Sequence, residues 1–280
     1  MRLFLLASSF IVTIFLLAGC DNVSPRAKLL PVTRDTTAAV TYPWLSQKPD
    51  PITQLVNVIT PKANYLRLTA MPGTFGEWVQ HLPLKAGNPP VLTDDGIEAP
   101  NQFKHAAVVN IDAGKNNLQL SANAILRLRA EYLFSKDWLW QINFPTKSGT
   151  KVDFRSWVKE KKLSPDHKAL IEYLQELFPQ TDATTLASML KPVKDIRDME
   201  PGDIMLKRDQ PEFAVLVLDV VQDPATNARY FLLGTSHYPA QDFYVIINPS
   251  TTPITPWYPQ ANKESGMPEG VFKAENLMRF

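Results

Sequence analysis

The chain has 280 residues, of which 45% are hydrophobic, 20% charged and 10% aromatic, and this composition excludes disorder throughout. The length allows one large or two small domains, each able to bury a core. With 29 Lys and Arg against 28 Asp and Glu, the net charge is +1, so no basic field is available for a phosphate backbone. The composition therefore argues against nucleic-acid binding.

The first residues have the pattern of a bacterial export signal. Arg2 precedes an apolar stretch from Leu3 to Leu17, which is too short to cross the roughly 30 Å hydrocarbon layer comfortably. Such a stretch is typical of the apolar region of a signal peptide, and we assign residues 1–19 to one.

The apolar stretch ends in a tetrapeptide, Leu17-Ala18-Gly19-Cys20, that resembles the lipobox of bacterial lipoproteins. That resemblance implies that Cys20 becomes the first mature residue and carries the acyl chains that anchor it to a membrane. Asp21 is similar to the signal that retains Gram-negative lipoproteins in the inner membrane, facing the periplasm. Because Cys20 is the one cysteine, the mature domain has no thiol for a disulfide, a zinc site or a nucleophile.

Six prolines soon after the anchor predict extended or irregular chain, because proline lacks an amide donor and helical freedom. We interpret residues 20–61 as a lipid-anchored, Pro-rich tether, residues 62–258 as the folded domain and residues 259–280 as a C-terminal tail. Tyr42 and Trp44 are apolar enough to dock the end of the tether on the domain.

Apolar periodicity and capping residues in the first half of the domain predict helices mixed with short strands. Four helices are expected: one that begins at the Thr74-Phe75-Gly76-Glu77 capping box, one over about 118–134, one after an N-cap at Ser164, and a short one over 186–190. Strands are expected at 106–111 and 138–144. Arg127 and Glu131 lie four residues apart on the second helix and are expected to form an ion pair.

The second half of the domain changes to short strands separated by turn residues. They are expected at 203–206, 213–221, 230–234 and 243–248. Short connections between them predict an antiparallel sheet, and the doubly apolar run at 213–218 is typical of a central strand covered on both faces. Helices followed by strands predict an α+β fold.

Three stretches carry a family resemblance when they are taken together. They are residues 117–133, which contain NLQLSANA and RLRAEYL, residues 199–204 with MEPGDI, and residues 238–245 with YPAQDFYV. In this order and spacing they resemble a family of exported bacterial proteins that share a domain of unknown function, number four-eight-four-six. The likeness runs from about Tyr65 to Tyr258.

That family looks like a distant relative of the papain-like cell-wall amidases of the NlpC and CHAP type, which implies a papain-like core. In those enzymes a Cys at a helix N-terminus faces a His at the start of a strand, and both the helix terminus and the imidazolium lower the thiol pKa. The position aligned with the Cys is Ser121 here, and the position aligned with the His is Phe213. The resemblance thus implies the frame of an amidase without its thiol chemistry.

Three residues are weak candidates for remaining catalysis. Ser121 would serve as a nucleophile only with an adjacent base, which His237 or His105 would have to supply. The alternative interpretations are a packing residue for Ser121 and an ordinary turn histidine for His237.

No cofactor or metal is expected from the sequence. The four histidines show no paired spacing, and the 11 glycines form no phosphate-binding loop. His81 and His167 are interpreted as helix-surface residues. Arg127 and Arg129 are interpreted as structural ion-pair partners rather than anion ligands, since neighbouring apolar positions place their helix inside the fold.

We therefore expect a membrane-anchored cell-envelope lipoprotein whose domain is not catalytic. It would bind a cell-wall fragment or an envelope protein through the former active-site cleft or an aromatic surface. Two alternatives stay open: a serine-based cell-wall amidase or peptidase that uses Ser121, and a structural accessory subunit of an envelope complex. A Ser121 hydroxyl within about 3.2 Å of an imidazole nitrogen would favour the enzyme. A cleft filled by Phe213 would favour the non-catalytic functions.

Overall fold

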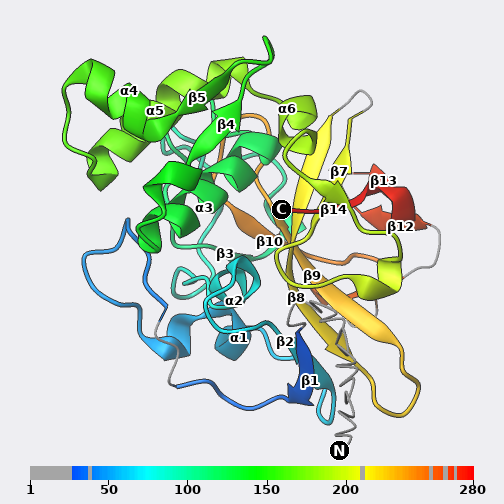
Figure 1. The fold of residues 1–280 in the computed structure, drawn as a ribbon. Coiled ribbons are helices and arrows are strands. Elements are labelled where there is room, and N and C mark those ends of the chain that lie inside the picture. The colour runs from blue at the N-terminus through cyan, green and yellow to red at the C-terminus, as the bar shows by residue number, and fades with distance from the viewer. Residues whose placement is uncertain (1–26, 37–39, 209–211, 252–254, 261–263, 268–269) are drawn as a thin grey trace, which may run out of the picture.

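The structure is a computed structural model with helices packed on a large antiparallel sheet (Figure 1). It describes residues 27–280 apart from 37–39, 209–211, 252–254, 261–263 and 268–269. The predicted α+β class and antiparallel sheet are confirmed. The assignments of the signal peptide, Cys20 and Asp21 lie outside the described residues.

The main sheet of the described chain has ten strands, and its strand pairs are antiparallel. Seven of these strands lie side by side in the order β3, β10, β9, β8, β7, β14 and β6. Of the other three, β2 pairs with both β8 and β1, and β11 pairs with β9. The strand bounds are β1 Lys28–Pro31, β2 Leu66–Thr69, β3 His105–Val108, β6 Lys191–Pro192, β7 Ile204–Lys207, β8 Phe213–Gln222, β9 Arg229–Thr235, β10 Tyr244–Ile246, β11 Tyr258–Pro259 and β14 Leu277–Arg279.

β8 is the central strand of the sheet, and apolar side chains project from both of its faces, as expected for a strand that is covered on both sides. Residues 213–221 are all buried, so the prediction of a strand covered on both sides is confirmed. One face joins the core cluster that the helices share, through Ala214, Leu216, Leu218 and Val221. The other face joins a second cluster, through Phe213, Val215, Val217 and Val220.

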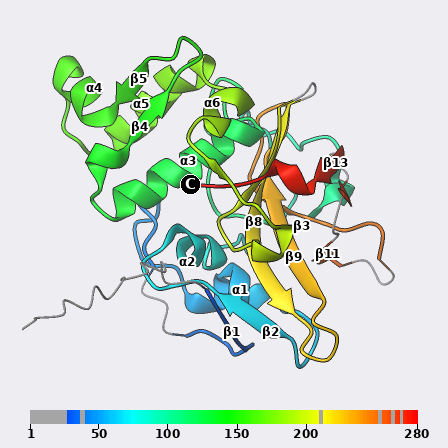
Figure 2. The ribbon, with the colours of Figure 1, turned by 45° about the vertical axis from the view of Figure 1, so that its right-hand side comes forward.

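Figures 1 and 2 show helices α1 to α3 together on one side of the sheet. The helix bounds are α1 Leu55–Val58, α2 Phe75–Gln80, α3 Ser121–Ser135, α4 Phe154–Lys161, α5 His167–Leu177 and α6 Ala183–Ala187. α3 packs against β8, and every residue from Ser121 to Leu133 is buried except Arg129. From Ser121 to Leu133 the long predicted helix is therefore an interior helix with one exception, Arg129.

Two small hairpins complete the described structure. β4 (Asn143–Pro145) pairs with β5 (Lys151–Asp153) beside α4 and α5, and β12 (Glu264–Met267) pairs with β13 (Gly270–Lys273). The predicted strand at 138–144 is wrong over its first half, because Leu139–Gln141 forms a 3-10 turn before β4 begins.

Helix starts follow the predicted chemistry with small shifts. Thr74 accepts a hydrogen bond from the backbone N–H of Glu77 at 3.3 Å, but the Glu77 carboxylate accepts from the N–H of Gly73 instead of closing the box on Thr74. α5 begins after Asp166 rather than Ser164, because the Asp166 carboxylate caps the helix by accepting a backbone N–H.

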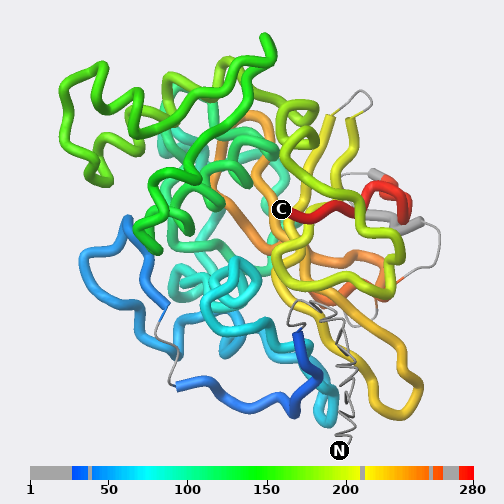
Figure 3. Tube along the Cα trace, viewed as in Figure 1, coloured from blue at the N-terminus to red at the C-terminus, as the bar shows by residue number. Residues whose placement is uncertain are grey.

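The described parts of the expected tether and tail contribute to the fold. Figure 3 traces β1 alongside β2, and the buried Tyr42 donates its hydroxyl to the carbonyl of Trp78 at 3.0 Å. At the other end, β14 lies inside the sheet between β7 and β6. Strand pairing and buried side chains such as Tyr42 and Leu277 therefore attach these segments to the fold.

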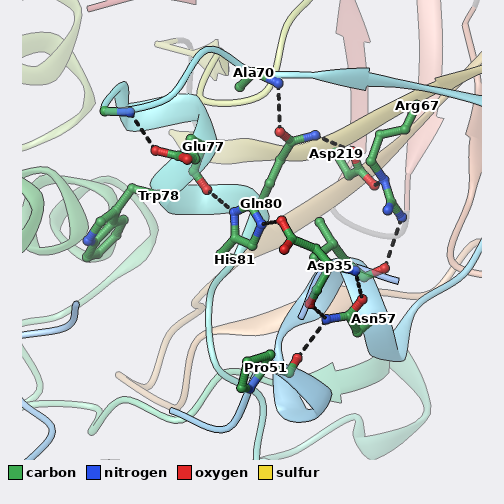
Figure 4. A network of polar contacts seen from close by, with 12 residues as sticks. Asp35, Pro51, Asn57, Arg67, Ala70, Glu77, Trp78, Gln80, His81 and Asp219 are labelled. Atoms are coloured by element: carbon green, nitrogen blue, oxygen red, sulfur yellow. Dashed lines mark hydrogen bonds and ion pairs between the residues drawn. The ribbon is translucent and has the colours of Figure 1, made fainter. Parts of the chain in front are cut away.

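A buried polar network that includes the Arg67–Asp219 ion pair connects α2 to strands β2 and β8 of the sheet (Figure 4). Oδ2 of Asp219, on β8, accepts from Nε of Arg67 at 2.8 Å, and Oδ1 accepts from Nε2 of Gln80 at 2.7 Å. Gln80 accepts in turn from the N–H of Ala70 at 2.9 Å. Burial raises the pKa of Asp219, although the Arg67 charge acts in the opposite direction.

The interpretation of His81 and His167 as helix-surface residues is wrong for His81. That residue is buried at the end of α2, and its Nε2 lies 3.0 Å from Oδ2 of Asp35 (Figure 4). His167 is half-buried, with Nε2 at 2.9 Å from Oε1 of Glu131. Both imidazoles are thus engaged by carboxylates inside the fold.

Candidate functional site

The N-terminus of α3 meets the start of β8, and this meeting point holds both positions aligned with amidase chemistry. Ser121 is the first residue of α3, and Phe213 is the first residue of β8. Both residues are 8% exposed. Oγ of Ser121 accepts a hydrogen bond from the backbone N–H of Ala214 at 3.3 Å. The serine oxygen is therefore engaged by the strand.

The two histidines considered as general bases, His105 and His237, do not contact the Ser121 hydroxyl in the described structure. The His237 ring is 5.3 Å from the Phe213 ring, and its Nδ1 accepts from the N–H of Tyr238 at 2.8 Å. His105 and His237 line one small cavity of about 20 Å³, to which Ser121 does not contribute. Within the described chain, Ser121 has no hydrogen bond to an imidazole and Nδ1 of His105 is buried without a partner.

Arg127 lies at the centre of a complete charge network on α3. Its Nε donates to Oε1 of Glu131 at 2.8 Å, which confirms the predicted ion pair, and its terminal nitrogens donate to Gln119 and Asp112. Burial lowers the pKa of Arg127, but the Glu131 and Asp112 carboxylates outweigh it, so the pKa is raised. Each of the three guanidinium nitrogens of Arg127 thus donates a hydrogen bond to a neighbouring side chain, which is consistent with a structural role.

Arg129 has no such network. It lines a cavity of about 630 Å³ that lies among α2, α3, the turn before β7, the end of the chain and Ala27. Its guanidinium carbon lies over the rings of Phe75 at 5.1 Å, Tyr132 at 5.2 Å and Phe280 at 4.6 Å. Among the residues that the structure describes, its side chain has no hydrogen bond or ion pair. The interpretation of Arg129 as an ion-pair partner is therefore wrong.

Burial lowers the pKa of Arg129 to about 10. The guanidinium still carries its charge at neutral pH. A half-buried cation without a counter-ion is unusual, because removing a charge from water is costly unless it is paired.

The remaining charges around the cavity differ in how far they are neutralised. Arg279 donates from Nε and Nη2 to the two carboxylate oxygens of Asp203 at 2.5 and 2.8 Å. Its Nη1 lies 3.2 Å from Oε2 of Glu200. Burial raises the pKa of Asp203 to about 6, against the effect of Arg279. Lys136 extends over the Tyr132 ring at 5.9 Å and has no ion pair in the described chain.

Two glycines allow the close approach at one wall of the cavity. A Cβ on Gly76, in α2, would lie 2.5 Å from the carbonyl oxygen of Pro201. Gly202 has a φ of +92°, which favours glycine. The MEPGDI stretch therefore forms a turn that fits against the first turn of α2.

Sequence reasoning missed this cavity because its walls come from distant segments. One local signal was present: Arg129, Tyr132 and Lys136 have the spacing i, i+3, i+7, which places two cations and an aromatic ring on one face of α3. The other aromatic residues, Phe75 and Phe280, reach Arg129 only through the tertiary fold.

The fold and site define an α+β protein in which a helix N-terminus meets the start of a central antiparallel strand. Farther along the same helix is an aromatic cavity lined by an arginine that has no ion pair in the described chain. The model of one family, described as a domain of unknown function (4846), matches residues 55–279, and the chain belongs to that family. No curated protein and no solved structure matches the chain. In the described part of the chain, no helix has the length and apolar character needed to cross a membrane.

Proposed function

We propose that the protein is a cell-envelope lipoprotein, anchored to the inner membrane through acylated Cys20, whose papain-like domain binds a cell-wall fragment without cleaving it. The carrying observation is the engagement of Ser121, at the position aligned with the amidase Cys, by the backbone N–H of Ala214. Phe213, at the position aligned with the His, is a buried apolar residue.

The chemistry of acyl transfer supports the non-catalytic part of the proposal. A serine hydroxyl is a weak nucleophile at neutral pH and needs a base within hydrogen-bond distance. The described chain offers Ser121 a backbone N–H, while His237 is held by its own neighbour Tyr238. An amidase mechanism that used Ser121 would therefore lack a base to accept the proton of its hydroxyl group.

The cavity around Arg129 supports the binding part of the proposal. Its volume of about 630 Å³ lies within the usual range of small-molecule sites, and aromatic rings line it. Arg129 follows Ser121 by eight residues, or about 12 Å along the axis of α3. The proposed ligand therefore occupies the aromatic surface and not the former active-site cleft.

The test is to incubate the purified lipoprotein with isolated cell wall. Sedimentation measures how much protein binds, and mass spectrometry measures any released fragments. We expect saturable binding without release, for wild type and for Ser121→Ala alike. Thermal unfolding of the variant controls for the loss of the hydrogen bond to Ala214.

Two results would overturn the proposal. Release by wild type that disappears in Ser121→Ala would establish a serine amidase, since general-base catalysis is worth about 10²- to 10⁴-fold in rate. Absence of both binding and release would leave the structural accessory subunit as the better interpretation.

A further inference from the structure

We infer that the cavity around Arg129 recognises a carboxylate, held by the Arg129 guanidinium, on a ligand whose neighbouring apolar part contacts Phe75, Tyr132 and Phe280. This inference rests on the proposed function, because it names the chemical group by which the cell-wall fragment would be bound.

The first step concerns free hydrogen-bond donors. A guanidinium has five N–H donors, and in the described chain none of those on Arg129 has an acceptor. Its nitrogens are also not among the fully buried side-chain atoms that lack a partner, so they remain open to the cavity that Arg129 lines. The donors are therefore available to a ligand inside this cavity.

The second step concerns the sign and size of the ligand charge. Of the cations around the cavity, Arg279 is neutralised by Asp203 and Glu200, whereas Arg129 and Lys136 are not. The cations that have no ion pair in the described chain thus lie on the α3 side, where they would attract an anionic group of a ligand. The two acidic residues on the other wall disfavour a multiply charged group such as phosphate.

The third step concerns shape. The planar fork of an arginine matches a carboxylate through two parallel hydrogen bonds. Three aromatic rings hold the guanidinium, and the Tyr132 hydroxyl is itself fixed by donating to the carbonyl of Gly73 at 2.7 Å. Trp138 is 39% exposed and lines the same cavity. The site is therefore preorganised for a carboxylate beside an apolar or aromatic surface.

The experiment compares two probes by calorimetry with the purified full-length protein: a muramyl tripeptide with free carboxyl groups, and the same compound with those groups amidated. We expect the acid to bind about 10- to 100-fold more tightly than the amide, from the strength of a hydrogen bond to a charged group. This comparison needs no variant, so it does not depend on how a substitution affects folding.

Arg129→Gln should weaken binding of the acid by about the same factor and leave binding of the amide unchanged. Arg129→Lys keeps the charge but loses the planar fork, and should lie between wild type and Arg129→Gln. Arg155→Gln, which removes an exposed arginine of α4, is the matched control and should bind as wild type does. Circular dichroism and thermal unfolding verify the fold of each variant.

Equal binding of acid and amide by wild type would overturn the inference, as would full binding of the acid by a folded Arg129→Gln. If neither probe binds while the protein still sediments with cell wall, the proposed function stands and the inference fails. If both the probes and the cell wall fail to bind, the inference and the proposed function fall together.

Discussion

Asp219 is a carboxylate with no exposed surface, and its neighbours Arg67 and Gln80 supply its compensation. Arg67→Met should lower the free energy of unfolding by about 3–5 kcal/mol, because it leaves a buried carboxylate without its counter-charge. Urea unfolding at neutral pH measures this loss. The double variant Arg67→Met/Asp219→Leu should recover much of it, and a double variant as unstable as the single one would contradict the explanation.

Asp203 gives a pH dependence with a definite sign. Its pKa is raised from 3.8 to about 6, so the folded state holds this proton more tightly than the unfolded state does. The stabilisation is complete below about pH 4 and is lost as pH rises through 6.

We therefore expect wild type to lose about 2 kcal/mol of unfolding free energy relative to Asp203→Asn between pH 4 and pH 7. Urea unfolding of both proteins across this range measures the difference. Subtracting the variant removes the contribution of the other carboxyl groups. A difference that grows in favour of wild type with rising pH would show that the Arg279 ion pair outweighs burial.

At the scale of single residues, the sequence predicts ion pairs better than it predicts free charges. Arg127 and Glu131 are four residues apart on one helix, so their contact follows from local geometry. Arg129 belongs to the same helix, but its lack of an acceptor depends on residues brought in from distant segments. The position of a charged residue along a helix predicts its neighbours on that helix. It does not predict which residues of other segments will face it.

Among the elements, α2 is positioned by a glycine in its first turn. Gly76→Ala should lower the free energy of unfolding by about 1–3 kcal/mol, because the new Cβ would meet the carbonyl of Pro201. The sign is opposite to that of helix propensity, which favours alanine by about 0.5–1 kcal/mol. Thermal or urea unfolding distinguishes the two, and a stabilised variant would show that the turn can move away.

The order and type of most elements follow from local pattern, since β8 is apolar on both faces and α3 shows helical spacing. Their exact limits depend on which polar side chain reaches a free N–H, as the capping of α5 by Asp166 shows. Proline content alone did not predict β1, because strand pairing with β2 and buried side chains such as Tyr42 determine that region.

For the whole molecule, the proposed function requires that Cys20, which the lipobox resemblance indicates, is the site of acylation. Cys20→Ala should leave the precursor uncleaved and unlabelled when cells are grown with a radioactive fatty acid, because no other thiol is present. Gel mobility and lipid labelling of the two forms measure this. Normal labelling of the variant would remove the anchor from the proposal.

Ala27 lies on the wall of the Arg129 cavity and follows Cys20 by seven residues. A fully extended chain spans at most about 3.6 Å per residue, so these residues reach no more than about 25 Å. If Cys20 is acylated and held in a bilayer, as we propose, Ala27 stays within this distance of the lipid headgroups. The proposed anchor would therefore favour small fragments that diffuse to the membrane surface over polymer fixed farther away.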